Sequence, residues 1–122
     1  MNKDISILVC DDSILARKNL CTVLSDFGYT NISETNNGEE AVSFCKENKP
    51  DLIFLDIVMP VKDGVTATAE IMSAYPDANI IIVSSVGTQT HIKEAIKAGA
   101  KDFIQKPIDE DLLKQIMENL NG

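Results

Sequence analysis

Two hydrophobic periodicities alternate along the chain and predict an ordered series of strands and helices. Short apolar runs bounded by turn residues are typical of strands that are buried on both faces of a sheet. The sequence contains four such runs, and a weaker fifth in which polar residues alternate around Ile32. The predicted strands span residues 5–10, 30–35, 52–55, 79–83 and 101–105.

The segments between the predicted strands carry apolar residues at helical spacing. The first of these stripes consists of Ala16, Leu20, Val23, Leu24 and Phe27. Gly28 is placed to end that helix. The stripe that contains Thr68, Ile71, Met72 and Tyr75 stops at Pro76. Residues 39–48 supply a shorter helical segment, and the stripe that contains Ile92, Ala95 and Ile96 is followed by Gly99. The last stripe, which consists of Leu112, Leu113, Ile116 and Leu120, follows the acidic residues 109–111, where the helix dipole favours carboxylates.

A strand followed by a helix, repeated five times, predicts an α/β fold whose parallel sheet is covered by helices on both faces. Right-handed crossovers favour a doubly wound five-stranded sheet, with the strand order 2-1-3-4-5 of flavodoxin-like (βα)5 proteins. A chain of 122 residues has the length of one domain, so we expect residues 1–122 to form a single unit. Ligands of such sheets bind beyond the carboxyl ends of the strands, which directs the search for function to five short loops.

Composition and charge restrict the class of protein further. Hydrophobic residues make up 44 % and charged residues 25 % of the chain, which is typical of soluble globular proteins. No uninterrupted apolar run exceeds four residues, which excludes a membrane span and the apolar segment of a signal peptide. A net charge of −8 argues against direct binding of nucleic acid. Three cysteines, an odd number, exclude a full disulfide framework and predict buried thiols in the cytoplasm.

Acidic and hydroxyl residues follow the predicted strands at the edge where a ligand would bind. Asp11 and Asp12 come after the first strand, and Asp56 comes after the third. Because strands one and three are neighbours in the order 2-1-3-4-5, these three carboxylates should converge. Ser84 follows the fourth strand and Lys106 follows the fifth, so both should lie on the far wall of the same pocket.

Each of these residues also has an ordinary structural explanation. Asp12 or Ser13 is suited to capping the following helix, and Asp56 to starting a turn. Ser84 is suited to being a plain loop hydroxyl, and Lys106 to extended backbone before a proline. Together these explanations fail on energy, because two unit charges 4 Å apart repel by about 4 kcal/mol at an effective dielectric near 20. Three clustered carboxylates would cost several kcal/mol, comparable with the stability of a small domain.

A divalent cation would offset the repulsion that one lysine leaves uncompensated. Carboxylates, backbone carbonyls and water are the ligands that Mg²⁺ prefers. A magnesium site beside a lysine suits phosphoryl transfer, because both cations neutralise the phosphoryl oxygens while a carboxylate attacks in line. Asp56 is the central carboxylate and the candidate nucleophile, and its attack would give an aspartyl phosphate. Ser84 is placed to hydrogen-bond the new phosphoryl group.

With these residues, the chain resembles the receiver domain of two-component response regulators, including the single-domain chemotaxis receivers. The resemblance covers essentially the whole chain and rests on a specific signature. Its parts are the acidic pair Asp11-Asp12, Asp-x-x-Met-Pro at residues 56–60, Asp63-Gly64, Ser84, Lys106-Pro107 and the run from Ala98 to Phe103.

The resemblance implies a role for each site residue. Asp56 would accept a phosphoryl group from a phosphohistidine on a sensor histidine kinase or a phosphotransfer protein. Asp12, Asp56 and the backbone carbonyl of Val58 would ligate Mg²⁺, and Asp11 would act through a bound water. Lys106 would contact the phosphoryl oxygens, and in this family its bond to the following proline is often cis.

The resemblance also implies a two-state switch. Ser84 would move inward to bond the phosphoryl group, and Phe103 would change rotamer behind it. The surface formed by the fourth helix, fifth strand and fifth helix would then change and control a downstream partner. Residues 87–106 hold four lysines and two acidic residues, a net +2. Lys93, Lys97 and Lys101 would either steer an acidic partner or simply solvate an exposed face.

We therefore expect a regulatory protein whose only chemistry is self-phosphotransfer and slow autodephosphorylation. It would be cytoplasmic and monomeric, with no direct contact to nucleic acid or membrane, and would be either a free-standing receiver or part of a longer regulator. Three residues depart from many relatives. Val58 and Val86 stand where polar residues are common and would shield the phosphoryl group from water. Phe103 lacks the hydroxyl of the tyrosine found in many chemotaxis members.

Three other functions compete with this interpretation. An aspartate-nucleophile phosphatase of the haloacid dehalogenase type needs a second acid two residues after the nucleophile, where this chain has Val58. A flavodoxin-like FMN binder needs a Ser/Thr/Gly-rich anion cradle after the first strand, where Asp11 and Asp12 would repel phosphate. Aromatic residues to hold a flavin make up only 5 % of the chain. A phosphate-independent interaction module is the third alternative, and the complete set of site residues argues against it.

Overall fold

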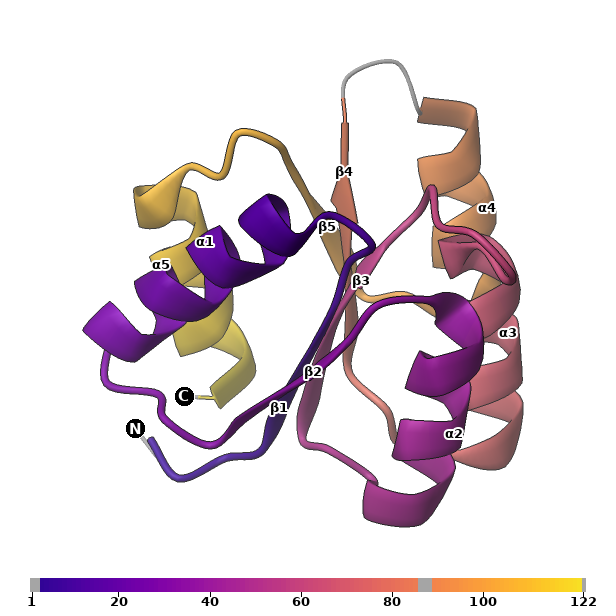
Figure 1. The fold of residues 1–122 in the computed structure, drawn as a ribbon, viewed down its shortest axis with the longest axis horizontal. Coiled ribbons are helices and arrows are strands. Elements are labelled where there is room, and N and C mark those ends of the chain that lie inside the picture. The colour runs from indigo at the N-terminus through magenta and orange to yellow at the C-terminus, as the bar shows by residue number, and fades with distance from the viewer. Residues whose placement is uncertain (1–2, 86–88, 122) are drawn as a thin grey trace.

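The computed structural model describes residues 3–85 and 89–121, and over them five strands alternate with five helices (Figure 1). The elements are β1 (Ile7–Cys10), α1 (Ile14–Asp26), β2 (Ile32–Thr35), α2 (Gly38–Asn48), β3 (Leu52–Asp56), α3 (Gly64–Ala74), β4 (Ile80–Ser84), α4 (Gln89–Ala98), β5 (Asp102–Gln105) and α5 (Glu110–Asn121). The predicted alternation is confirmed, and each strand end lies within two residues of its predicted position.

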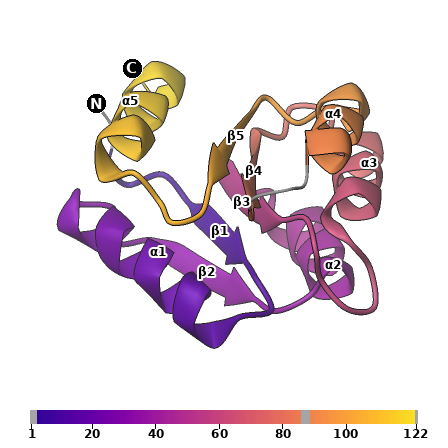
Figure 2. The same cartoon turned by 90° about the horizontal axis from the view of Figure 1, so that it is seen from above.

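All five strands are parallel and lie in the order β2-β1-β3-β4-β5, which confirms the predicted topology. Helices α1 and α5 cover one face of the sheet, and α2, α3 and α4 cover the other (Figure 2). Strands β1 and β3 therefore lie side by side near the middle of the sheet. The residues that follow them meet at one edge.

Alternating side chains of each strand build a separate hydrophobic core on each face of the sheet. In β1, Ile7 and Val9 pack in the core beneath α1 and α5, whereas Leu8 and Cys10 pack in the core on the opposite face. Strands β1, β3 and β4 are buried along their whole length, as a sheet covered on both faces requires. The ends of these strands are therefore fixed by packing on both sides.

Polar caps fix where the helices begin. The Ser13 hydroxyl accepts a hydrogen bond from the Ala16 N–H at 3.2 Å, so Ser13 is the N-cap of α1. Asn37 and Asp63 cap α2 and α3 in the same way. Since Ser13 caps α1, the neighbouring Asp12 carboxylate is not needed for that purpose.

The apolar stripe of α5 differs from the predicted one. Leu113 and Ile116 are buried as predicted, but Met117 completes the buried set, while Leu112 and Leu120 are exposed. Adjacent helical residues point about 100° apart, so Leu112 and Leu113 cannot both face the core. Buried residues at positions i, i+3 and i+4 form the narrow stripe that packs against the sheet.

Two of the three thiols are buried as predicted. Cys10 and Cys45 are 2 % and 1 % exposed, and burial raises the pKa of each to about 12. Cys21 is only half-buried, on α1. Over residues 3–85 and 89–121, none of the helices combines the length and the apolar character needed to cross a lipid bilayer.

Two of the glycines allow close approaches that fix how α3 and α4 pack. A Cβ on Gly64, the first residue of α3, would lie 2.2 Å from the backbone oxygen of Asp56. A Cβ on Gly99, directly after α4, would lie 2.6 Å from Cγ of Met72 in α3, and Gly99 has a φ of +124°. The first approach packs the start of α3 against the end of β3, and the second packs the end of α4 against α3.

We expect Gly64→Ala to destabilise the fold by about 2–3 kcal/mol, because the backbone oxygen of Asp56 cannot move away without displacing β3. Urea unfolding followed by circular dichroism measures this effect, since the chain has no Trp. Thr66→Ala, an exposed position in the same helix, is the control and should change stability by less than about 0.5 kcal/mol. Equal stability of the two variants would contradict the prediction.

Candidate functional site

Three carboxylates meet at the carboxyl ends of β1 and β3. Asp11 and Asp12 follow β1, Asp56 is the last residue of β3, and one oxygen from each lies within 4.8 Å of the others. Asp11 and Asp56 are 4 % and 5 % exposed, whereas Asp12 is exposed to solvent. The predicted convergence of the three acids is therefore present, and two of them are held away from bulk water.

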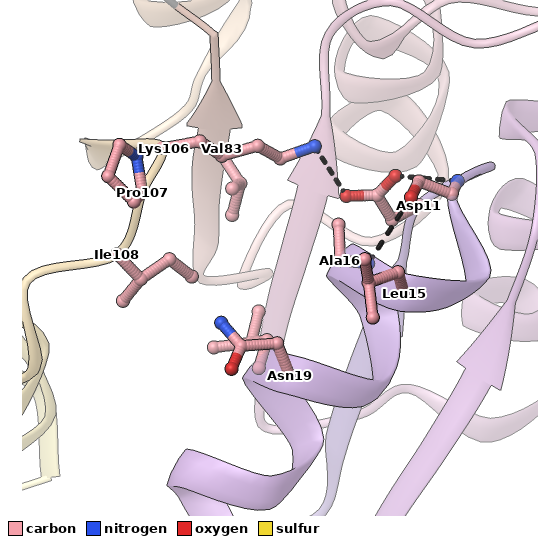
Figure 3. Close-up of a pocket in the computed structure, with 10 residues that line it drawn as sticks. Asp11, Leu15, Ala16, Asn19, Val83, Lys106, Pro107 and Ile108 are labelled. Carbon is pink, nitrogen blue, oxygen red and sulfur yellow. Dashed lines mark hydrogen bonds and ion pairs between the residues drawn. The ribbon is translucent and has the colours of Figure 1, made fainter.

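Lys106 reaches into the carboxylate cluster from the loop after β5 (Figure 3). Its Nζ lies 2.7 Å from Oδ2 of Asp11 and 3.5 Å from Oδ2 of Asp56. Its backbone N–H donates to the Ser84 carbonyl at 2.7 Å, and the peptide bond to Pro107 is cis. One ammonium group therefore faces three carboxylates, which leaves the site with an excess of negative charge.

The electrostatics of the cluster follow from burial and from this charge imbalance. Burial, and then the charge of Asp11, raise the pKa of Asp56 to about 6, although Lys106 opposes the shift. For Lys106, burial lowers the pKa, but hydrogen bonds and charges from Asp11 and Asp56 outweigh it and hold the pKa above its usual value. Without a bound cation, the site disfavours the charged form of the Asp56 carboxylate. The site therefore favours binding of a cation.

The backbone around Asp11 is held by contacts on two sides. The Ser13 N–H donates to Oδ1 of Asp11 at 2.9 Å, and Nη1 of Arg17 donates to the Asp11 carbonyl at 2.6 Å. Arg17 also pairs with Glu34 of β2 at 2.9 Å. Sequence reasoning missed Arg17, because its contact depends on how α1 lies across the end of the sheet and no motif marks it.

Ser84 is completely buried as the last residue of β4, so its interpretation as a loop hydroxyl is wrong. Its Oγ has no hydrogen-bond partner within the described part of the chain. Buried hydroxyls are normally hydrogen-bonded, so an unpaired one next to a charged site is suited to a bound ligand.

The remaining predicted residues lie at different distances from the cluster. Val58 lies two residues after Asp56 in the loop before α3, with its side chain 65 % exposed. Phe103 is on β5, where it is paired with Ile82 in the sheet register and is 43 % exposed. Val86 falls outside the described residues. The structure thus groups Lys106 with the three acids, places Ser84 and Val58 beside them, and puts Phe103 further back along the sheet.

A cavity of about 420 Å³ lies beside Asp11 and Lys106, between α1 and the segment after β5 (Figure 3). Its walls are mainly apolar and include Leu15, Leu20, Val83, Pro107 and Ile108. The exposed side chains of Ile14 and Leu15 lie at the start of the same helix. The acidic site therefore borders an apolar surface that is accessible to a partner.

The donor set fits a hard divalent cation. Carboxylate oxygens are preferred by Mg²⁺ and Ca²⁺, whereas softer metals select imidazole or thiolate ligands. Within residues 3–85 and 89–121, Asp11, Asp12 and Asp56 are the one group of three His, Cys, Asp or Glu side chains close enough to share an ion. The cluster contains neither His nor Cys, so its chemistry favours magnesium over zinc or copper.

This arrangement of site and sheet defines a signalling domain. The chain belongs to the response regulator receiver domain family, whose sequence profile matches residues 7–118. Receiver domains bind Mg²⁺ at an acidic pocket and interact with histidine kinases and downstream effectors, and they are regulatory proteins rather than classical enzymes.

Several relatives are chemotaxis proteins. The chain is 44 % identical over 115 residues to the chemotaxis protein CheY of Thermotoga maritima, covering 94 % of this chain and 93 % of the relative. It is 42 % identical over 116 residues to CheY of Bacillus subtilis, covering 94 % and 97 %.

Solved structures agree with this fold. The chain is similar, with a TM-score of 0.86 and 34 % identity, to the CheX–CheY–BeF3–Mg²⁺ complex from Borrelia burgdorferi, covering 94 % of this chain and 88 % of that one. It is also similar to the NtrX receiver domain from Brucella abortus, with a TM-score of 0.87 and 31 % identity, covering 94 % and 97 %. The fold and the CheY-like family assignment predicted from the sequence are confirmed.

We expect Asp56→Ala to stabilise the metal-free protein at pH 7–8 by roughly 2 kcal/mol, because it removes a carboxylate whose charged form is disfavoured by burial. Since folding raises the pKa of Asp56 from 3.8 to about 6, the wild type loses stability as the pH rises through that interval. The advantage of the variant should therefore disappear below pH 4. Asp12→Ala, at an exposed position, should stabilise less. Thermal unfolding without Mg²⁺ tests both, and equal or lower melting temperatures for both variants at pH 7–8 would contradict the prediction.

Proposed function

We propose that this protein receives a phosphoryl group on Asp56 in a Mg²⁺-dependent reaction of two-component signalling. The observation that carries the proposal is the cluster of three carboxylates at the carboxyl edge of the sheet, two of which pair with Lys106. An excess of buried negative charge is expensive unless a cation binds, and an acidic magnesium site beside a lysine suits phosphoryl transfer.

Each residue of the cluster has a distinct role in the proposed reaction. Asp12, Asp56 and the carbonyl of Val58 would hold Mg²⁺, and Asp11 would hold it through a water. When bound, the ion would neutralise negative charge on the phosphoryl oxygens. A carboxylate oxygen of Asp56 attacks phosphorus in line, so that the new P–O bond forms as the P–N bond to the donor imidazole breaks. Lys106 then pairs with a phosphoryl oxygen in place of a carboxylate.

The response to phosphorylation would begin at Ser84. Leaving a buried hydroxyl unpaired costs about 1–3 kcal/mol, and a phosphoryl oxygen on Asp56 offers the missing acceptor. We infer that this contact draws Ser84 inward, that Phe103 changes rotamer, and that the face formed by α4, β5 and α5 changes shape. Lys93 and Lys97 are exposed on that face and suit an acidic partner.

The protein partners follow from the surfaces around the site. A sensor histidine kinase or phosphotransfer protein is the phosphodonor, and the exposed Ile14 and Leu15 beside the site offer apolar area for it to bury. The downstream partner binds the face of α4, β5 and α5. The CheY relatives support a role in chemotaxis. We propose that residues 1–122 act as one receiver, monomeric and cytoplasmic, without direct binding of nucleic acid.

The proposed chemistry is limited to self-phosphotransfer and slow autodephosphorylation. A phosphatase of the haloacid dehalogenase type would need an acid at position 58, where this chain has an exposed valine. A flavodoxin-like function would place a phosphate next to Asp11 and Asp12, which repel it. The charged site lies beside the buried Ser84 hydroxyl, which is unpaired within the described residues, and this favours the receiver over a phosphate-independent interaction module.

Treatment with acetyl phosphate and Mg²⁺ should add one phosphoryl group to the wild-type chain, measured as intact mass. Asp56→Ala should block the addition, because it removes the attacking carboxylate. Asp77→Ala, which removes an exposed acid from the segment that enters β4, at the opposite edge of the sheet from the site, should behave like the wild type. Addition that persists in Asp56→Ala, or that proceeds equally without Mg²⁺, would overturn the proposed function.

We expect Val58→Asn to shorten the lifetime of the phosphorylated protein, because a polar side chain at this position can guide water to the phosphoryl group that valine shields. The lifetime is measured as the decay of phosphorylated protein after removal of acetyl phosphate. Leu120→Asn provides the control, since Leu120 is an exposed apolar residue near the end of α5. An unchanged lifetime for Val58→Asn would remove support for the shielding role.

A further inference from the structure

The loop between Asp56 and α3 contains a strained turn. Val61 has a φ of 68°, a conformation that β-branched residues rarely adopt. The Lys62 N–H donates to the Pro60 carbonyl at 2.7 Å, so Val61 is the central residue of a γ-turn with positive φ, the rare and strained form. The Val61 side chain is 80 % exposed, so it buries too little apolar surface to offset the strain. Contacts made by neighbouring residues must hold the turn.

Lys62 supplies these contacts at three points. Its Nζ lies 2.9 Å from Oε2 of Glu39 in α2 and 2.7 Å from Oε2 of Glu70 in α3. Its carbonyl accepts a hydrogen bond from the Gly38 N–H at 3.2 Å. Although charged, the Lys62 side chain is only 17 % exposed. Lys62, the last residue of the strained turn, is thus bound to the start of α2 and to α3.

The loop between β3 and α3 ends close to Asp56, the residue at which it starts. The Gly64 N–H donates to the Ile57 carbonyl at 2.8 Å, and Gly64 packs on the backbone oxygen of Asp56. Near the middle of the loop, Sδ of Met59 lies 3.5 Å from Sγ of Cys10 in β1. Both ends of the loop therefore lie at Asp56, and a change in the turn would be transmitted to Asp56 and Val58.

We infer that Lys62 is a positioning residue for the metal site, because its bridge between Glu39 and Glu70 holds the strained turn that places Asp56 and the Val58 carbonyl. This inference rests on the proposed function, in which both groups bind Mg²⁺. Simple electrostatics predicts the opposite effect, because a lysine near a cation site repels the cation. Removing Lys62 therefore weakens Mg²⁺ binding if Lys62 positions the ligands, and strengthens it if Lys62 acts only through its charge.

Isothermal titration of the full chain with MgCl₂ distinguishes these effects. We expect Lys62→Met to weaken Mg²⁺ binding about tenfold, as loss of a residue that orients metal ligands does. Lys62→Arg, which keeps the charge and can bridge both glutamates, should restore most of the affinity. Lys101→Met, which removes an exposed lysine that donates to Asn79 at 2.7 Å before the start of β5, is the control and should bind Mg²⁺ as the wild type does.

The strained turn is tested by adding Val61→Gly to Lys62→Met. Glycine adopts positive φ without strain, so the turn no longer needs to be held, and the double variant should recover most of the Mg²⁺ affinity. Failure to recover would overturn the role of the turn. Affinity in Lys62→Met equal to or above that of the wild type would overturn the positioning role. If that variant does not fold by circular dichroism, Lys62→Gln is measured against the same criterion. A wild-type chain that does not bind Mg²⁺ would instead overturn the proposed function.

Discussion

Repulsion between buried carboxylates is the constraint on which the site depends. The order of the strands forces it, because β1 and β3 are neighbours, Asp11 directly follows β1, Asp56 ends β3, and both acids are almost fully buried. Lys106 offsets part of the charge, but burial, and then the charge of Asp11, still hold the pKa of Asp56 above its usual value. The fold thus gives up some stability at one edge of the sheet and gains a site that favours a bound cation.

The rest of the structure holds this unfavourable arrangement in place. Strands β1, β3 and β4 are buried from end to end, so the residues at their ends have little freedom to separate. Arg17 fixes the backbone of Asp11, and Gly64 brings α3 against the backbone of Asp56. Ser84, at the end of β4, keeps a buried hydroxyl that has no partner among residues 3–85 and 89–121 within this rigid frame. Sites built on packed strands in this way keep their geometry better than sites built on loops alone.

Much of the fold and the centre of the site could be predicted from the sequence, because both depend on features that are local in the chain. Buried strands are visible in the sequence as apolar runs, and the three acids directly follow two of these runs. The predicted core of α5 was wrong at Leu112 and Leu120, because hydrophobicity does not say which of two adjacent residues faces inward. The contacts of Arg17 and Lys62 could not be predicted, since they join elements whose relative placement only the folded chain defines. The roles of Val58 and Phe103 stay predictions.

The contact between Gly99 and Met72 has a mechanical consequence for the face that α4 presents. Gly99 lets the C-terminal end of α4 pack closely on Met72 of α3, so a tilt of this helix that keeps the contact turns about that end. The ten residues of α4 span about 15 Å, and a tilt of about 10° would therefore displace the first turn by about 2–3 Å while the last turn stays still. A partner protein that distinguishes between orientations of α4 therefore gains the most selectivity by binding the first turn of the helix.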